Sequence, residues 1–175
     1  MNDIQIGKPA PAFTLEGVID GGTFKTFSLA ENKGKWVVLF FYPRDFTFIC
    51  PTEITGFSKR IEDFKKLNAM VFGASTDSVH SHKAWLKELG TLAYPLLADT
   101  TQDVARRYGV LIPETGEALR GTFIVDPTGL LRYALYHDLN VGRSVKETLR
   151  VLEALQTGER CPVEWEPGVK TLGKG

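Results

Sequence analysis

The chain has few cysteines, no excess of charge of either sign and no long apolar segment. Its 175 residues include only two cysteines, Cys50 and Cys161, too few for the disulfide framework that stabilises small secreted domains. Acidic and basic residues number 21 each, so no overall basic field points to nucleic acid or to a membrane surface. The longest apolar run near the middle, WVVLFF, is far shorter than a membrane-spanning helix.

Several motifs are also missing. The first residues lack the basic flank and the apolar stretch of a signal peptide. We therefore expect a cytoplasmic protein, whose two cysteines are free, reactive or redox-cycling rather than a structural disulfide. No GxGxxG or GxxxxGK loop and no CxxC pair occurs, so neither nucleotide binding nor a thioredoxin-type dithiol is supported. The histidines and cysteines together match no compact zinc pattern.

The sequence does contain an alternation of strand and helix patterns. Strands are predicted at 13–15, 23–29, 36–42, 69–74, 121–126 and 130–137. Helices are predicted at 54–67, 81–89, 100–108 and 144–158. The last of them opens with a capping box at Ser144–Glu147 and stops at Gly158. The segment SVHSH, with His80 and His82, is interpreted as a solvated helix start.

The order of these elements predicts an α/β fold. The strands at 36–42 and 69–74 should pair in parallel across their intervening helix. A thioredoxin-like fold, with a central mixed sheet flanked by helices, fits this order, although other open α/β folds share it. The length suits one domain with a substantial core. We place that domain at residues 1–158 and a tail rich in Pro and Gly, carrying Cys161, at 159–175.

Both cysteines precede a proline. In FYPRDFTFICPTEI, Cys50 is expected just outside a helix, with Pro51 at the first helical position. Glu53 then falls at the third position, from which a carboxylate can close a capping box. The sulfur would lie at the positive end of the helix dipole. Helix N-termini and nearby cations lower the pKa of a cysteine from about 8.5 to roughly 3.5–7.5.

Simpler interpretations of the same residues remain open. From its position alone, Cys50 could equally be a small apolar residue packed at a strand–helix junction. Thr47, three residues earlier, could direct its hydroxyl at the sulfur or at a substrate, or it could be an ordinary loop residue. Cys161 lies in an irregular segment, where packing in a core is less expected, but a bystander thiol is possible there.

The segment FYPRDFTFICPTEI resembles the active-site signature of the typical two-cysteine peroxiredoxins, which include the peroxidase subunits of alkyl hydroperoxide reductase. Pro43, Thr47 and Cys50 stand at the positions of the PxxxTxxC pattern of that family. The segments PLLADTTQDVARRYGV, RGTFIVDPTGLLR, VGRSVKETLRVLEALQ and CPVEWEPG resemble further family segments in the expected order. The resemblance covers nearly the whole chain and implies a thioredoxin-like fold that needs no metal, haem or flavin.

The resemblance also implies a role for each site residue. Cys50 would attack the peroxide, and Cys161 would be the resolving cysteine. Arg120 would stand beside the sulfur. Pro43 would shield the pocket, and Thr47 would form hydrogen bonds with the thiolate and the peroxide.

The implied function is that of a thiol-dependent peroxidase in antioxidant defence and redox homeostasis. It would reduce hydrogen peroxide and organic hydroperoxides through a sulfenic acid and an intersubunit disulfide. Glu53 and Arg143 would hold the active-site arginines in a polar network. The implied partners are thioredoxin or a dedicated flavoprotein disulfide reductase as electron donor, and copies of the chain in a homodimer that assembles into a decamer. The alternatives are a ring-forming chaperone or scaffold, and a disulfide oxidoreductase without peroxidase activity.

Overall fold

The computed structural model describes residues 4–175. The chain divides into two compact units, one ending at Arg143 and the other comprising Ser144–Gly175. The last helix therefore belongs with the residues that follow it. The predicted catalytic domain at 1–158 and tail at 159–175 form a different division, which stays a prediction.

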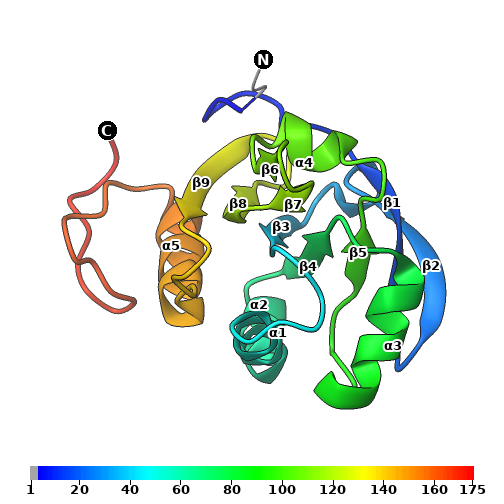
Figure 1. Cartoon of the computed structure of the whole chain (residues 1–175). Coiled ribbons are helices and arrows are strands. Elements are labelled where there is room, and N and C mark those ends of the chain that lie inside the picture. Colours follow the sequence, from blue (N-terminus) through cyan, green and yellow to red (C-terminus); the bar gives the residue numbers. More distant parts are fainter. Residues whose placement is uncertain (1–3) are drawn as a thin grey trace. The chain divides into compact units, whose positions relative to one another are not determined.

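A mixed sheet of seven strands forms the centre of the first unit, in the order β2-β1-β5-β4-β3-β8-β9 (Figure 1). The strands are β1 (Thr14–Ile19), β2 (Thr23–Ser28), β3 (Trp36–Phe41), β4 (Ala69–Ser75), β5 (Leu96–Ala98), β8 (Arg120–Val125) and β9 (Leu131–His137). β3, β4 and β5 are parallel, as predicted for the first two, and the outer pairs are antiparallel. Two short strands, β6 (Leu111–Ile112) and β7 (Glu117–Ala118), form a separate ribbon. The predicted mixed sheet is confirmed.

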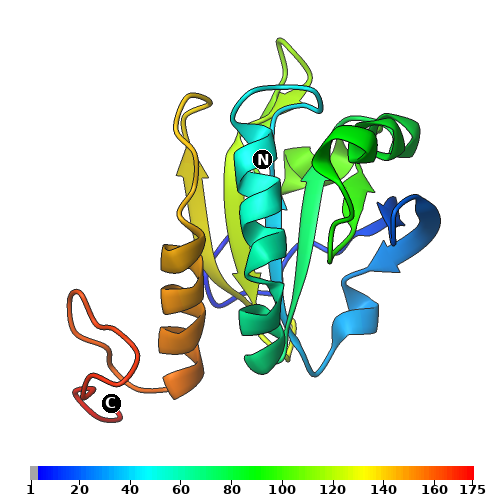
Figure 2. The same ribbon diagram turned by 90° about the horizontal axis from the view of Figure 1, so that it is seen from below.

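The helices of this unit differ from the predicted ones mainly at their ends. They are η1 (Ala30–Asn32, a 3-10 turn), α1 (Cys50–Lys59), α2 (Ile61–Lys66), α3 (Val79–Leu89) and α4 (Asp103–Arg107). The single helix predicted at 54–67 is wrong, because the backbone leaves helical geometry at Arg60 (φ −106°, ψ 12°). Figure 2 shows α1 and α2 following one another along the sheet. α4 begins late because Gln102 takes a left-handed conformation, with φ 62°.

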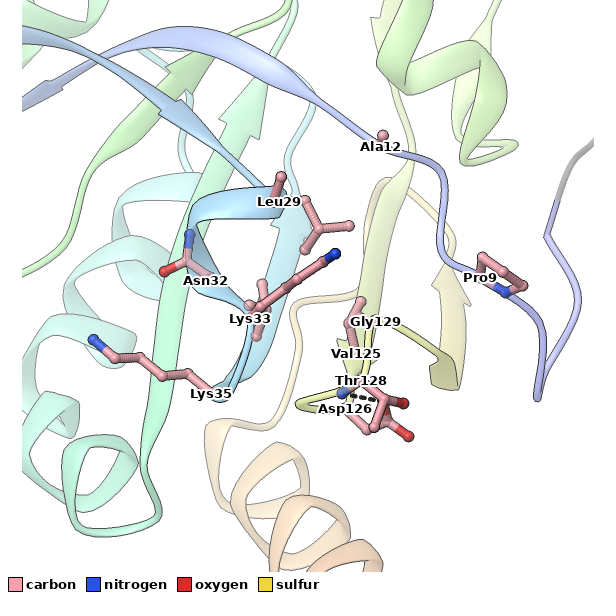
Figure 3. Close-up of a pocket in the computed structure, with 12 residues that line it drawn as sticks. Pro9, Ala12, Leu29, Asn32, Lys33, Lys35, Val125, Asp126, Thr128 and Gly129 are labelled. Atoms are coloured by element: carbon pink, nitrogen blue, oxygen red, sulfur yellow. Dashed lines mark hydrogen bonds between the residues drawn. The ribbon is translucent and has the colours of Figure 1, made fainter.

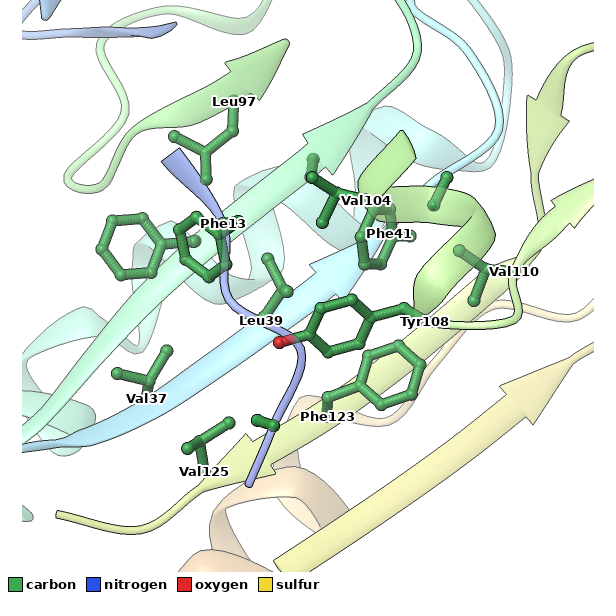
Figure 4. Packing of buried hydrophobic residues seen from close by; sticks show 14 of the residues in the cluster. Phe13, Val37, Leu39, Phe41, Leu97, Val104, Tyr108, Val110, Phe123 and Val125 are labelled. Carbon is green, nitrogen blue, oxygen red and sulfur yellow. The ribbon is translucent and has the colours of Figure 1, made fainter. Parts of the chain in front are cut away.

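β3 is buried on both faces, as its unbroken apolar sequence predicts. Successive side chains alternate between the faces. Leu39 lies in the cluster drawn in Figure 4. Further members of that cluster are Phe13, Val37, Phe41, Leu97, Val104, Tyr108, Val110, Phe123 and Val125. On the other face, the Phe40 ring stacks on Phe57 of α1, with ring centroids 4.4 Å apart. β3 thus ends in a rigid, packed position immediately before the loop that leads to Cys50.

The second unit consists of α5 (Val145–Thr157) and the segment after it. The Ser144 hydroxyl accepts a hydrogen bond from the Glu147 N–H at 3.1 Å, and Gly158 ends the helix with φ 63°, so both predicted helix ends are confirmed. Residues 159–175 form no helix or strand. They close into a loop, in which the Arg160 N–H donates to the Gly173 carbonyl (3.0 Å) and the Leu172 N–H donates to the Arg160 carbonyl (2.8 Å).

Within residues 4–175, none of the helices combines the length and the apolar character needed to cross a bilayer.

Candidate active site

Cys50 is the first residue of α1, and its side chain is completely buried. The carbonyl of Ile49 accepts hydrogen bonds from the N–H groups of Thr52 (3.0 Å) and Glu53 (3.4 Å). Ile49 is therefore the residue that precedes the helix, and Pro51 occupies the second helical position. The predicted placement of Cys50 just outside the helix is wrong by one residue. The sulfur still lies in the first turn, at the end where backbone N–H groups are unpaired.

Arg120 is the cation at the sulfur. It lies at the start of β8, and its Nη1 is 3.3 Å from Cys50 Sγ and 2.6 Å from Glu53 Oε2. Its Nε donates to the carbonyl of Leu139 at 2.8 Å. Arg120 is 3% exposed, so these contacts fix its guanidinium in one position. The structure thus brings together Cys50 and Arg120, which are 70 residues apart in the sequence.

Glu53 bridges two arginines. Its Oε2 contacts Arg120 and also Arg143 Nη2 (2.8 Å), while its Oε1 accepts from Arg143 Nε (3.0 Å) and from the Arg143 backbone N–H (2.8 Å). Burial by itself raises the pKa of the Glu53 carboxyl, but the bonds and charge of Arg143, with the charge of Arg120, bring this pKa below its ordinary value. The predicted capping box is wrong, because the carboxylate faces these arginines and not the start of the helix.

Arg143 joins this network to the ends of two strands. Its Nη1 donates to the carbonyls of Phe41 and Gly121, both at 2.7 Å. Its guanidinium carbon lies 4.8 Å from the centroid of the Phe40 ring. Burial lowers the pKa of the Arg143 guanidinium, although Glu53 opposes the shift. The polar network implied for Glu53 and Arg143 is therefore present around Arg120.

Pro43 and Thr47 lie in the loop between β3 and α1. Pro43 is buried and Thr47 is half-buried. The Thr47 hydroxyl donates to the carbonyl of Arg44 at 3.1 Å, so in this state its proton points to the loop backbone and not to the sulfur. The role of Thr47 toward a peroxide stays a prediction.

Cys161 lies in the second unit and is half-buried. Its Sγ is 3.8 Å from the carbonyl oxygen of Ala154 and 3.9 Å from that of Glu159. Both cysteines are free thiols. The structure therefore describes the reduced chain.

Sequence reasoning missed His82. The segment around it was expected to be solvated, and His80 is indeed exposed, but His82 is completely buried. Val79, His82 and Leu86 are spaced by three and four residues, and this spacing places His82 on the buried face of α3. That periodicity was the signal that could have identified it.

Figure 3 shows a separate cavity, with a volume of about 280 Å³. Its lining includes Lys35 and Val37 at the amino end of β3, whereas Cys50 follows the carboxyl end of that strand. None of the predicted site residues lines it. Among residues 4–175, no three His, Cys, Asp or Glu side chains form a group that could hold a metal ion.

Comparisons with known proteins agree with this geometry. Residues 6–134 match the model of the AhpC/TSA family. The chain is 54% identical over 180 residues to the candidate peroxiredoxin YkuU of Bacillus subtilis, covering 98% of this chain and 100% of that protein. It is 51% identical over 185 residues to peroxiredoxin prdx-2 of Caenorhabditis elegans, covering 100% and 92%. The crystal structure of the reduced Plasmodium vivax 2-Cys peroxiredoxin matches with a TM-score of 0.92 at 36% identity, covering 95% of this chain and 91% of that one.

The chain belongs to the AhpC/TSA family and is a peroxiredoxin, an enzyme that reduces peroxide by means of a cysteine thiol. Its fold is the thioredoxin-like fold of these relatives, which confirms the fold that the order of elements fitted and the resemblance implied.

Proposed function

We propose that Cys50 is the peroxide-attacking residue of this enzyme and that Cys161 of a second copy resolves the oxidised product. The observation that carries the first part is the contact of 3.3 Å between Arg120 Nη1 and Cys50 Sγ in a buried site at a helix N-terminus. A cation and a helix start both favour a thiolate over a thiol, and the thiolate is the nucleophile.

The chemistry follows from this arrangement. The Cys50 thiolate attacks one oxygen of hydrogen peroxide or of a small organic hydroperoxide, and the O–O bond breaks. The sulfur becomes a sulfenic acid, and the second oxygen leaves as hydroxide or alkoxide, which takes a proton from the solvent. Arg120 can stabilise the charge that develops on the leaving oxygen. The buried Pro43 limits the access of water. Thr47 lies three residues before Cys50, and its hydroxyl orients the peroxide after the loop has adjusted.

A disulfide must then replace the sulfenic acid. The Cys161 thiol of the partner subunit attacks the sulfenic sulfur of Cys50 and releases water. A disulfide needs Cα atoms within about 7 Å of each other, and Cys50 is completely buried, so the first turn of α1 has to open. A protein dithiol, supplied by thioredoxin or a dedicated flavoprotein disulfide reductase, restores both thiols. We infer a cytoplasmic homodimer that assembles into a decamer and serves antioxidant defence.

A gel of peroxide-treated protein tests the disulfide. The oxidised wild type should run as a dimer without reductant and as a monomer with it. Cys161→Ser and Cys50→Ser should each abolish the dimer band, and only Cys50→Ser should abolish peroxide consumption in the first turnover. A disulfide-bonded monomer in the wild type would contradict the intersubunit bond. Peroxide consumption by Cys50→Ser at the wild-type rate would contradict the role of Cys50.

A further inference from the structure

A buried charged group holds the loop between β3 and α1. Asp45 lies in this loop, and its side chain is 1% exposed. Its Oδ1 accepts a hydrogen bond from the Tyr42 hydroxyl at 2.9 Å, and its Oδ2 accepts one from the Ser81 hydroxyl at 2.7 Å. The third contact is made by His82 Nδ1, 2.7 Å from Oδ2. One carboxylate therefore connects the catalytic loop to the start of α3.

His82 has an oxygen acceptor at each of its ring nitrogens. Nδ1 faces the Asp45 carboxylate, and Nε2 is 3.1 Å from the carbonyl oxygen of Leu97 in β5. The Tyr42 hydroxyl also lies 3.3 Å from Nδ1, but it donates its proton to Asp45 Oδ1 at 2.9 Å. A backbone carbonyl can only accept. A neutral imidazole carries one N–H, so its other nitrogen would face an oxygen lone pair with no proton between them. Each of the two contacts therefore needs its own proton. The His82–Asp45 pair must hold one proton more than a neutral imidazole and a carboxylate hold together.

Apart from His82, the side chains that the structure shows bonded to Asp45 are two hydroxyls and, at its backbone N–H, a second carboxylate. Tyr42 directly follows β3, Ser81 lies in α3, and Asp77 lies in the loop after β4. Asp77 Oδ2 accepts from the Asp45 backbone N–H at 2.9 Å and from the Ser75 hydroxyl at 2.8 Å. Burial, and then the charge of Asp45, hold the pKa of Tyr42 well above its ordinary value, so Tyr42 stays a neutral donor. Removing the extra proton would leave a net negative charge in a site without solvent.

We propose that His82 and Asp45 form a buried imidazolium–carboxylate pair that positions the loop 42–49, and hence Pro43 and Thr47, for the reaction of Cys50 with peroxide. His82 is a positioning residue, because it acts through Asp45 and not on the sulfur. The loop enters α1 at Ile49, so a shift at Asp45 moves both the substrate side of the site and the first turn of the helix. This proposal rests on the proposed role of Cys50.

Nitrogen NMR of ¹⁵N-histidine-labelled wild type tests the proton directly. His82 should show the signature of two protonated ring nitrogens at pH 7, with slow exchange. The exposed His80 supplies the signal of a solvent-exposed ring in the same spectrum. A His82 ring with one protonated nitrogen and an Nδ1 or Nε2 lone pair at pH 7 would overturn the proposal. This result does not depend on peroxide chemistry, so it stands even if Cys50 proves unreactive.

The variant His82→Gln tests the positioning role. Its amide can still reach Leu97 but leaves Asp45 without its cation. The second-order rate constant for oxidation of Cys50 by hydrogen peroxide should fall about 10-fold to 100-fold, while the matched control His80→Gln should keep the wild-type rate. The rate is measured well below the unfolding temperature of each variant. If folded His82→Gln oxidises Cys50 at the wild-type rate and differs only in stability, the pair is merely structural and the proposal is overturned. If that variant does not fold, the NMR measurement on the wild type decides.

Discussion

Arg120 has two partners in the active site, since one nitrogen contacts both the Cys50 sulfur and the Glu53 carboxylate. It is therefore held in place before a peroxide arrives, and its charge need not reorganise during the reaction. Arg120→Ala should lower the second-order rate constant of Cys50 with peroxide by about 10²–10³-fold, the usual loss when one preorganised donor is removed.

Stopped-flow measurement of Cys50 oxidation by hydrogen peroxide in the wild type and in Arg120→Ala checks this prediction. A rate for Arg120→Ala within threefold of wild type would show that the helix start alone activates the sulfur.

The Glu53 carboxylate lies between two buried guanidinium groups, those of Arg120 and Arg143. Removing one partner of a buried ion pair costs about 3–5 kcal/mol, so Glu53→Gln should lower the free energy of unfolding by about that amount at pH 7. The pKa of Glu53 is lower in the folded state. The stabilisation that the Glu53 carboxylate gives is therefore fully present above the pKa that this group has in the unfolded chain. It is lost as the pH falls through the pKa that the group has in the folded chain.

Urea unfolding between pH 3 and pH 7 measures this effect. The difference between wild type and Glu53→Gln should shrink toward the acid end of the series. The exposed carboxylate of Glu62, which pairs with Lys65 at 2.7 Å, provides the control variant Glu62→Gln, for which the change should stay below about 1 kcal/mol. A pH-independent difference for Glu53→Gln would contradict the role assigned to its charge.

The sequence predicted some of these residues better than others. Cys50, Pro43 and Thr47 lie within one short segment, so a local pattern identifies them. The contact between Glu53 and Arg143 spans 90 residues, and no local pattern records it; only the resemblance to the family implied it. Local reasoning instead paired Glu53 with the helix start, because it could not include two buried cations from elsewhere in the chain.

At the scale of the elements, the first turn of α1 has two incompatible tasks. It buries Cys50 in the reduced enzyme, and in the proposed mechanism it has to release Cys50 for a disulfide. Hydrogen exchange should therefore be faster at the amides of Thr52 and Glu53, which bond to Ile49, in the disulfide form than in the reduced form. Mass spectrometry of the peptide covering 49–57 measures this, and the amides of β3 provide the reference that should not change. Equal protection in both forms would mean that the helix stays wound and that Cys161 reaches a buried sulfur.

The elements themselves were predictable where the pattern was long. β3 and β4 are runs of six and seven residues with few polar side chains, and α5 carries a cap at each end. β5 was missed because three residues are too few to show a period. No proline or glycine stands at Arg60 to signal the break between α1 and α2. The apolar spacing across 54–67 therefore predicted a single helix.

At the scale of the whole molecule, the proposed formation of a disulfide depends on the loop that carries Cys161. Trp165 anchors this loop within its own unit: its ring is buried, its Nε1 donates to the Val169 carbonyl at 2.8 Å, and its carbonyl accepts from Arg150 at 2.8 Å. Trp165→Ala should free Cys161 from its contacts with α5 and speed up disulfide formation after one pulse of peroxide. The oxidation rate of Cys50 should not change.

Rapid quench followed by non-reducing electrophoresis follows that step. Val163 is 91% exposed and lies in the same loop, so Val163→Ala is the matched control and should behave as wild type. Slower disulfide formation in Trp165→Ala would show that the anchored loop is the productive conformation.

The central claim is that Cys50, and not Cys161, is the thiol activated for peroxide. Its most direct test is to treat the reduced protein with less than one equivalent of hydrogen peroxide, trap sulfenic acid with dimedone within the first turnover, and locate the adduct by mass spectrometry in the wild type and in Cys161→Ser. The account predicts that the adduct forms at Cys50 in both proteins and accumulates in Cys161→Ser, where nothing resolves it. An adduct at Cys161, or equal labelling of both cysteines, would contradict it.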